Sequence, residues 1–168
     1  MNSNKSLKIT SRKSQVHGFT LLELIIVLLI GSILLAWGVP GYQRLKARRM
    51  VTEFANEMVY SFTQARAEAV RYGTNVEVEP LGAWQNGWTV TALGVDGSAD
   101  ILISQQDPVD GRMTLVQSGS LQGKVVFNSL GGLTGVDEGV FRLANNSIGT
   151  ELRRIDISMV GKMKVVRL

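Results

Sequence analysis

Glu23 is the one charged residue in an otherwise apolar run that extends from Gly18 to Val39. Residues 19–39 number twenty-one. An α-helix of that length, at about 1.5 Å per residue, crosses a hydrocarbon core roughly 30 Å thick. An uncompensated carboxylate in that core costs on the order of 3 kcal/mol on insertion scales. Glu23 therefore predicts a partner that compensates its charge.

The side chains that most enzymes use for catalysis are scarce. The chain has no cysteine, which excludes disulfides, zinc-thiolate sites and thiol nucleophiles. The single histidine, His17, precedes the apolar run, so the domain cannot assemble a Ser-His-Asp triad or a histidine metal cluster. Asp96–Asp100 and Asp107–Gly111 carry carboxylates, but neither has the full ligand spacing of a calcium loop. We expect no catalytic residue, no metal site, no cofactor and no enzymatic activity.

A second group of candidate residues is basic and lies near the C-terminus. Lys162 and Lys164 alternate in a predicted strand and therefore share one face, with Arg153 or Arg154 across a hairpin and Arg167 beyond. A cationic ridge of this kind suits phosphates rather than base edges. We hypothesise that it binds duplex DNA. The alternative is an ordinary solvated strand face.

The formal charge of +4 is confined to the first eighteen residues, and the remaining 150 residues balance fourteen basic against fourteen acidic side chains. The chain after Gly18 therefore has no global attraction for nucleic acid, and any basic patch must be local. The polar, cationic leader indicates a cytoplasmic N-terminus. A conventional signal peptide, cleaved before Val39 after Ala36-Trp37-Gly38, is the alternative.

A long helix must position the membrane run. Between residues 42 and 72 the apolar residues step by three and four, and Gly73 is a natural C-terminal stop. The predicted buried stripe consists of Ala47, Val51, Phe54, Met58, Phe62, Ala65, Ala69 and Tyr72. Pro40 interrupts this helix and predicts a kink or local unwinding. The basic cluster 44–49 is interpreted as a collar at headgroup level, with lipid or nucleic-acid binding as the alternative.

After Gly73 the periodicity changes to two and glycines multiply. The predicted strands are 75–79, 87–93, 100–105, 113–117, 124–127, 140–143, 153–159 and 162–167. The first two and the last two are expected to form hairpins, the last turning at Val160-Gly161. Trp84 and Trp88 bracket a loop, where they pack in the core or stack a ligand. The predicted fold class is α+β, with a long N-terminal helix packed on an antiparallel β-sheet domain.

The run Gly18-Phe19-Thr20-Leu21-Leu22-Glu23, after a short basic leader and before an apolar helix with Pro40, resembles the class III signal of type IV pilins and pseudopilins. The resemblance implies that a prepilin peptidase cuts after Gly18 and N-methylates Phe19. His17 stands where a Lys, Arg or Gln is more familiar. The new amine at Phe19 is a cation, and a carboxylate four residues on, in its own or a neighbouring subunit, can neutralise it. Glu23 is then an assembly residue.

Downstream segments resemble the GspH/FimT group of pilin-like proteins. The segments are Val51–Gly73, which includes Ala65–Arg71, and Trp84–Trp88, Val126–Gly131 and Arg154–Lys162. FimT-like members are associated with DNA capture during transformation, and the corresponding Gly-Arg-x-Arg motif stands here as Gly161-Lys162-Met163-Lys164. Many relatives carry a C-terminal cysteine pair, which this chain lacks, so no disulfide role is carried over.

These observations predict four segments: a prepilin leader at 1–18, a transmembrane and assembly helix at 19–40, its amphipathic continuation at 41–73, and a GspH/FimT-type β-domain at 74–168. We expect a minor pilin in the bacterial inner membrane, with its N-terminus cytoplasmic and its domain periplasmic, incorporated into a type IV pilus at assembly initiation or the tip. The expected partners are prepilin peptidase, other pilins or pseudopilins and the inner-membrane assembly platform. A type II secretion pseudopilin and a pilus-associated receptor for double-stranded DNA are the alternatives.

Overall fold

The computed structural model describes residues 18–168 except 120, 122, 136 and 137. Within them, one long helix, α1 (Leu21–Tyr72), precedes eight strands and two short 3-10 helices, η1 (Trp84–Asn86) and η2 (Val95–Gly97). The strands are β1 (Val76–Pro80), β2 (Trp88–Ala92), β3 (Ile101–Gln106), β4 (Met113–Gly119), β5 (Val125–Phe127), β6 (Glu138–Asn145), β7 (Thr150–Ser158) and β8 (Met163–Arg167). The eight predicted strands are confirmed, with ends that shift by at most three residues.

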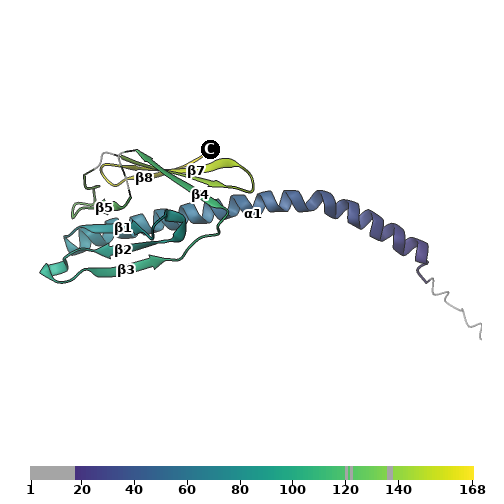
Figure 1. Cartoon of the computed structure of the whole chain (residues 1–168), viewed down its shortest axis with the longest axis horizontal. Helices are drawn as coiled ribbons and strands as arrows, with labels where there is room; N and C mark the ends of the chain where they lie inside the picture. The colour runs from purple at the N-terminus through teal and green to yellow at the C-terminus, as the bar shows by residue number, and fades with distance from the viewer. Residues whose placement is uncertain (1–17, 120, 122, 136–137) are drawn as a thin grey trace, which may run out of the picture. The chain divides into compact units, whose positions relative to one another are not determined.

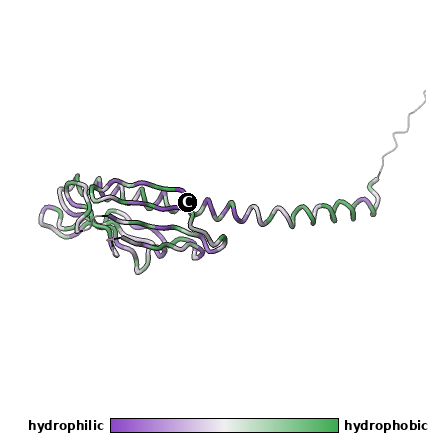
Figure 2. The backbone as a smooth tube through the Cα atoms, turned by 90° about the horizontal axis from the view of Figure 1, so that it is seen from above, coloured by the Kyte–Doolittle hydropathy of each residue, from purple (hydrophilic) through white to green (hydrophobic). Residues whose placement is uncertain are grey.

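The chain divides into two compact units, residues 1–40 and 41–168. The described part of the first unit holds the beginning of α1, whose large apolar side chains are exposed from Phe19 to Val39. Figure 2 shows hydrophobic colours along this part of the helix. By length and composition, α1 can cross a membrane. Pro40 lies inside α1, which continues through it as α-helix, so the structure shows no local unwinding there and the kink stays a prediction.

The second unit contains two antiparallel sheets of four strands. One has the order β3-β2-β1-β5, and the other has the order β4-β6-β7-β8. Figure 1 shows β1, β2 and β3 of the first sheet side by side. The β1–β2 hairpin pairs Val78 with Val90, and the β7–β8 hairpin pairs Ile155 with Val165, as the alternation predicts. The division into two sheets is a finding, because strand alternation alone does not say which strands pair.

One face of α1 after Gly41 packs against both sheets. Of the eight residues in the predicted stripe, seven are buried and Tyr72 is partly buried against the core. The ring of Phe62 lies 5.9 Å from that of Trp84 and 5.4 Å from that of Phe141 in β6, measured between centroids. Trp84 and Trp88 are buried, and Trp84 Nε1 donates to Gln117 Oε1 at 3.0 Å. Both tryptophans are therefore core residues, which excludes the ligand-stacking interpretation.

Arg66 of α1 fastens two loops of the domain to the helix. Its Nε donates to the carbonyl oxygen of Gly131 at 2.9 Å, in a partly buried position. Gly161, in the turn between β7 and β8, packs on the same carbonyl: a Cβ there would lie 2.1 Å from Gly131 O and 3.1 Å from Arg66 Nε. Gly161 also has a φ of +73°, which an L side chain rarely adopts. Close approach and backbone conformation both require glycine at this turn.

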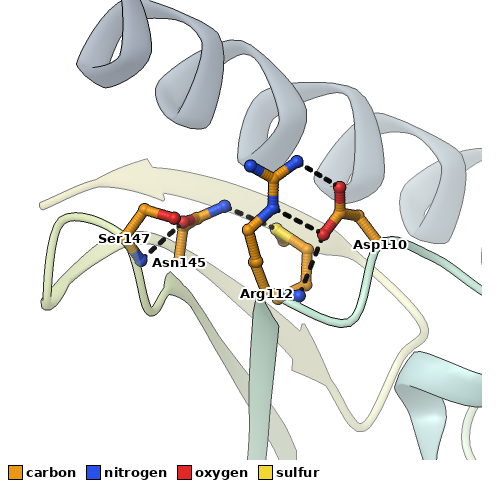
Figure 3. Close-up of polar contacts among 5 residues, drawn as sticks. Asp110, Arg112, Asn145 and Ser147 are labelled. Carbon is orange, nitrogen blue, oxygen red and sulfur yellow. Dashed lines mark hydrogen bonds and ion pairs between the residues drawn. The ribbon is translucent and has the colours of Figure 1, made fainter. Parts of the chain in front are cut away.

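A second polar cluster orders the ends of β4 and β6 (Figure 3). Arg112 donates from its backbone nitrogen and from Nε to Asp110 Oδ1, at 3.0 and 2.8 Å. These hydrogen bonds, together with the nearby charge of Lys46 in α1, hold the pKa of Asp110 well below its usual range. The buried Asn145 accepts from the backbone nitrogen of Ser147 at 2.9 Å, which shapes the β6–β7 turn.

Candidate functional site

The start of α1 carries the first candidate site. Thr20 precedes the helix, and its hydroxyl accepts a hydrogen bond from the backbone N–H of Glu23 at 3.2 Å. Thr20 therefore caps the helix N-terminus, and Glu23 stands at the third helical position, the spacing of a capping box. A carboxylate in the first turn also interacts favourably with the helix dipole. The capping role of Thr20 was not predicted from the sequence, although the Thr-x-x-Glu spacing indicates it.

The Glu23 carboxylate itself has no partner within the described part of the chain. Glu23 is exposed, and no described side chain forms an ion pair or hydrogen bond with its carboxylate oxygens. Its neighbours Leu22 and Leu24 are also exposed. The arrangement thus presents one negative charge on a wholly apolar helical surface. The Glu23 carboxylate can form an ion pair with a cation that comes from outside this helix.

The five basic residues proposed for DNA binding do not form one ridge. In the β7–β8 register Asp156 pairs with Lys164, Arg154 with Val166 and Arg153 with Arg167. Because alternate residues of a strand point to opposite faces, Arg154 and Lys164 share one face of the sheet and Arg153 and Arg167 share the other. Lys162 lies in the turn before β8 and is exposed. Of the two arginines predicted to lie beside Lys164 across the hairpin, only Arg154 is on the same face.

The outer face of this hairpin is partly neutralised. Arg154 binds Asp156, with Nη2 donating to Oδ2 at 3.0 Å. Asp156 also stands directly opposite Lys164 across the strand pair. Lys162 and Lys164 make no ion pair with any residue that the structure describes. The outer face consequently offers two free lysines beside a carboxylate rather than a continuous basic surface.

The inner pair of arginines faces α1. Arg153 is half buried, and its Nη2 donates to Thr52 Oγ1 of the helix at 3.2 Å. Arg153 and Arg167 line a groove of about 430 Å³ together with Arg48 and Arg49 of α1. The sequence did not predict that these arginines come together. The basic cluster at 44–49 and the C-terminal hairpin lie about a hundred residues apart in the chain.

Comparison with known proteins places the chain in a family. The family model described as Type II transport protein GspH matches residues 55–161, and the prokaryotic N-terminal methylation motif matches residues 13–39. The chain belongs to the GspH family. The first match covers α1 from residue 55 to its end, the seven strands β1 to β7 and Gly161, and it stops before β8. The second covers Gly18, Thr20 and Glu23. The family is one of type IV minor pilin-like and pseudopilin-like proteins.

Individual relatives agree with this GspH-family assignment. Two curated Pseudomonas aeruginosa proteins, each named fimbrial protein, are 36% identical over 102 residues, which cover 59% of this chain and 65% of theirs. The match thus spans slightly less than two thirds of those relatives. The crystal structure of the type IV minor pilin FimU from Pseudomonas aeruginosa matches with a TM-score of 0.57 at 22% identity, covering 74% of this chain and 90% of that one. At that identity the likeness shows the shared fold, with its one long helix packed on antiparallel sheets.

Proposed function

We propose that this chain is a minor pilin, processed after Gly18 by a prepilin peptidase, N-methylated at Phe19 and incorporated into a type IV pilus. The observation that carries the proposal is the capped apolar helix with the unpartnered Glu23 carboxylate, within a methylation motif and ahead of a GspH-family domain. No enzymatic role is proposed, since the family is one of structural subunits.

The physical role proposed for Glu23 is charge compensation. Cleavage after Gly18 creates a cationic amine at Phe19, and Glu23 follows four residues later. Phe19 directly precedes the N-cap Thr20 and Glu23 lies in the first helical turn, so the amine of one subunit can meet the carboxylate of the same or a neighbouring subunit. A buried cation or carboxylate without a partner is strongly unfavourable among packed apolar helices. Pairing between neighbouring subunits favours the filament over the separate, membrane-embedded subunit, whereas pairing within one subunit favours neither.

The proposed topology places residues 1–18 in the cytoplasm, the helix from Phe19 to Pro40 in the inner membrane and the domain in the periplasm. The basic leader supports that orientation. In this position the chain would meet the inner-membrane assembly platform and the other pilins before incorporation. We place it in the initiation complex or at the tip of the filament.

The experiment is to follow an epitope-tagged chain from the membrane to the filament. Pili sheared from cells and washed should contain the tagged chain, and the Gly18→Val variant, which blocks the proposed cleavage, should leave it in the membrane fraction. A tagged wild-type chain that stays in the membrane while pili are assembled would contradict the proposal.

A type II secretion pseudopilin is the main alternative, and the description of the family model supports it. The two roles use the same processing and the same helix, so the phenotype of a deletion separates them. A minor pilin predicts loss of surface pili with normal exoprotein secretion. A pseudopilin predicts the reverse.

A DNA-binding role of the pilus is a second candidate, favoured by the free Lys162 and Lys164 on the exposed outer face of the β7–β8 hairpin. Changing both to Ala should lower the affinity for duplex DNA and reduce the salt dependence of binding by about two phosphate contacts. Arg154→Ala is the matched control, because Asp156 already pairs with that arginine. Absence of salt-dependent binding in the wild type would exclude this role.

A further inference from the structure

A groove between α1 and the end of the β7–β8 hairpin is lined mainly by basic and apolar side chains. Arg48 and Arg49 of the helix and Arg153 and Arg167 of the hairpin line it, and Glu53 is the one acidic side chain among its nine lining residues. Its volume is about 430 Å³. The remaining lining residues include Leu45, Leu152 and Leu168, so the groove combines four guanidinium groups with an apolar wall.

Three of these arginines form no ion pair within the described part of the chain. Arg48, Arg49 and Arg167 are exposed and make no ion pair or side-chain hydrogen bond with a described residue. Glu53 stands four residues after Arg49 on the helix but does not form an ion pair with it. These arginines therefore offer positive charge with which a bound anion can pair.

The fourth arginine is held in place by neutral groups. Thr52 donates its one hydroxyl proton to the carbonyl oxygen of Arg48 at 2.9 Å, so towards Arg153 it can act as an acceptor, at 3.2 Å from Nη2. Arg153 Nη1 donates to the carbonyl oxygen of Leu152 at 3.1 Å. The guanidinium is thereby oriented while its positive charge stays uncompensated. A planar guanidinium fixed in this way suits bidentate contact with a phosphate.

The sequence position of the groove points to the source of that phosphate. Arg48 follows Val39, the end of the membrane-length apolar run, by nine residues. Four basic residues, at 44, 46, 48 and 49, flank this side of the run, as many as the leader carries on the other side. Such symmetry weakens the charge bias that orients a membrane helix, so the second cluster does not serve insertion and its presence calls for a different role.

We propose that this groove binds the phosphate of an anionic phospholipid headgroup, such as phosphatidylglycerol, in the leaflet that the domain faces before the subunit enters a filament. The arginines contact the phosphate, and Leu45 and Leu152 contact the glycerol and the first methylenes of the lipid. The proposal rests on the membrane anchoring proposed above. It adds a specific lipid site that holds the domain at the membrane surface.

The test uses the full chain, purified in a neutral detergent and mixed with equal amounts of phosphatidylglycerol and phosphatidylcholine, with retained lipid counted by native mass spectrometry. The groove variant is Arg48→Gln with Arg167→Gln, two residues whose side chains form no hydrogen bond or ion pair with a described residue. The matched control is Lys162→Gln with Lys164→Gln, which removes the same charge outside the groove. Inorganic phosphate and a short duplex DNA are added separately as competitors.

The wild type and the lysine control should retain phosphatidylglycerol in preference to phosphatidylcholine. A basic residue near an anionic surface changes binding about fivefold, so the groove variant should lose more than about tenfold of that preference. Equal retention of the two lipids by the wild type, or equal losses in both variants, would overturn the proposal. If inorganic phosphate or DNA competes for the groove as effectively as phosphatidylglycerol does, the groove binds that ligand rather than the lipid headgroup. This result would also overturn the proposal. A wild-type chain that does not fractionate with membranes before purification would, by contrast, contradict the proposed anchoring itself.

Discussion

The Thr20 hydroxyl accepts its hydrogen bond from the backbone N–H of Glu23, at 3.2 Å, and not from any part of the Glu23 side chain. The cap at the start of α1 therefore does not use the carboxylate. Capping of the helix and compensation of charge are two separate tasks of neighbouring residues, and single substitutions can separate them.

The first prediction concerns this pair. Glu23→Ala should leave membrane insertion intact, because it removes the one charge from the apolar run, but should prevent incorporation into filaments, because the amine at Phe19 loses its proposed partner. Thr20→Ala is the control: it weakens the helix end by about 1 kcal/mol and keeps the carboxylate. The measurement is the ratio of each variant in sheared pili and in membranes. Normal incorporation of Glu23→Ala would show that the carboxylate is not the assembly contact.

The second prediction tests the close packing of the β7–β8 turn. Gly161→Ala should destabilise the domain by more than about 2 kcal/mol, since the new Cβ meets Gly131 O at 2.1 Å in addition to the strain of a positive φ. Gly135→Ala has a similar φ, +75°, and open space around its Cβ, so it should cost about 1 kcal/mol. Urea unfolding of the full chain in detergent, followed by tryptophan fluorescence, measures both. Equal losses of unfolding free energy in the two variants would mean that the close approach to Gly131 does not contribute to the cost of Gly161→Ala.

The third prediction concerns Arg66. Its partly buried hydrogen bond to Gly131 O involves a charged donor, so Arg66→Ala should cost about 1.5–3 kcal/mol of unfolding free energy. Arg71→Ala, on the same helix, breaks an exposed ion pair with Glu68 and should cost about 0.5 kcal/mol or less. The same urea titration compares them. A smaller loss for Arg66→Ala than for Arg71→Ala would contradict the role of Arg66 in fastening the two loops.

The fourth prediction is a pH dependence. Hydrogen bonds from Arg112 lower the pKa of Asp110 in the folded chain, so this carboxylate contributes stability above its unfolded pKa of about 3.9 and loses it as the pH falls towards the folded value. Wild type should therefore melt at a higher temperature than Asp110→Asn at neutral pH, with a gap that narrows below about pH 4. Asp107→Asn, on the same loop and without a described side-chain partner, should show no such gap. A gap that does not change with pH would refute the linkage.

Most helices and strands of the fold could be predicted from the local periodicity of apolar residues. The three-and-four spacing from Ala47 to Ala69 identified the buried face of α1, and alternation located every described strand within three residues. Apart from the two expected hairpins, β1–β2 and β7–β8, strand pairing was not predicted, because the side chains of β4 and β6 show alternation but not which strand each pairs with. The division into two sheets, and the meeting of Phe62 with Trp84 and Phe141, depend on contacts between distant segments.

The candidate sites show the same limit. Glu23 could be singled out because a charge in a membrane-length run is costly wherever the chain folds. The basic hairpin could not be resolved, because the pairing register of β7 and β8 decides that Arg153 turns towards α1 while Arg154 turns outward to Asp156. The groove with Arg48 arises only once the hairpin packs on the helix.

The most direct test of the account is the N-terminus of the mature protein. Mass spectrometry of the N-terminal peptide from the chain purified out of cells that assemble pili should show a terminus at Phe19 carrying one methyl group. A terminus at Val39, as a conventional signal peptidase would leave, or an intact leader would contradict the proposal that this chain is a processed filament subunit.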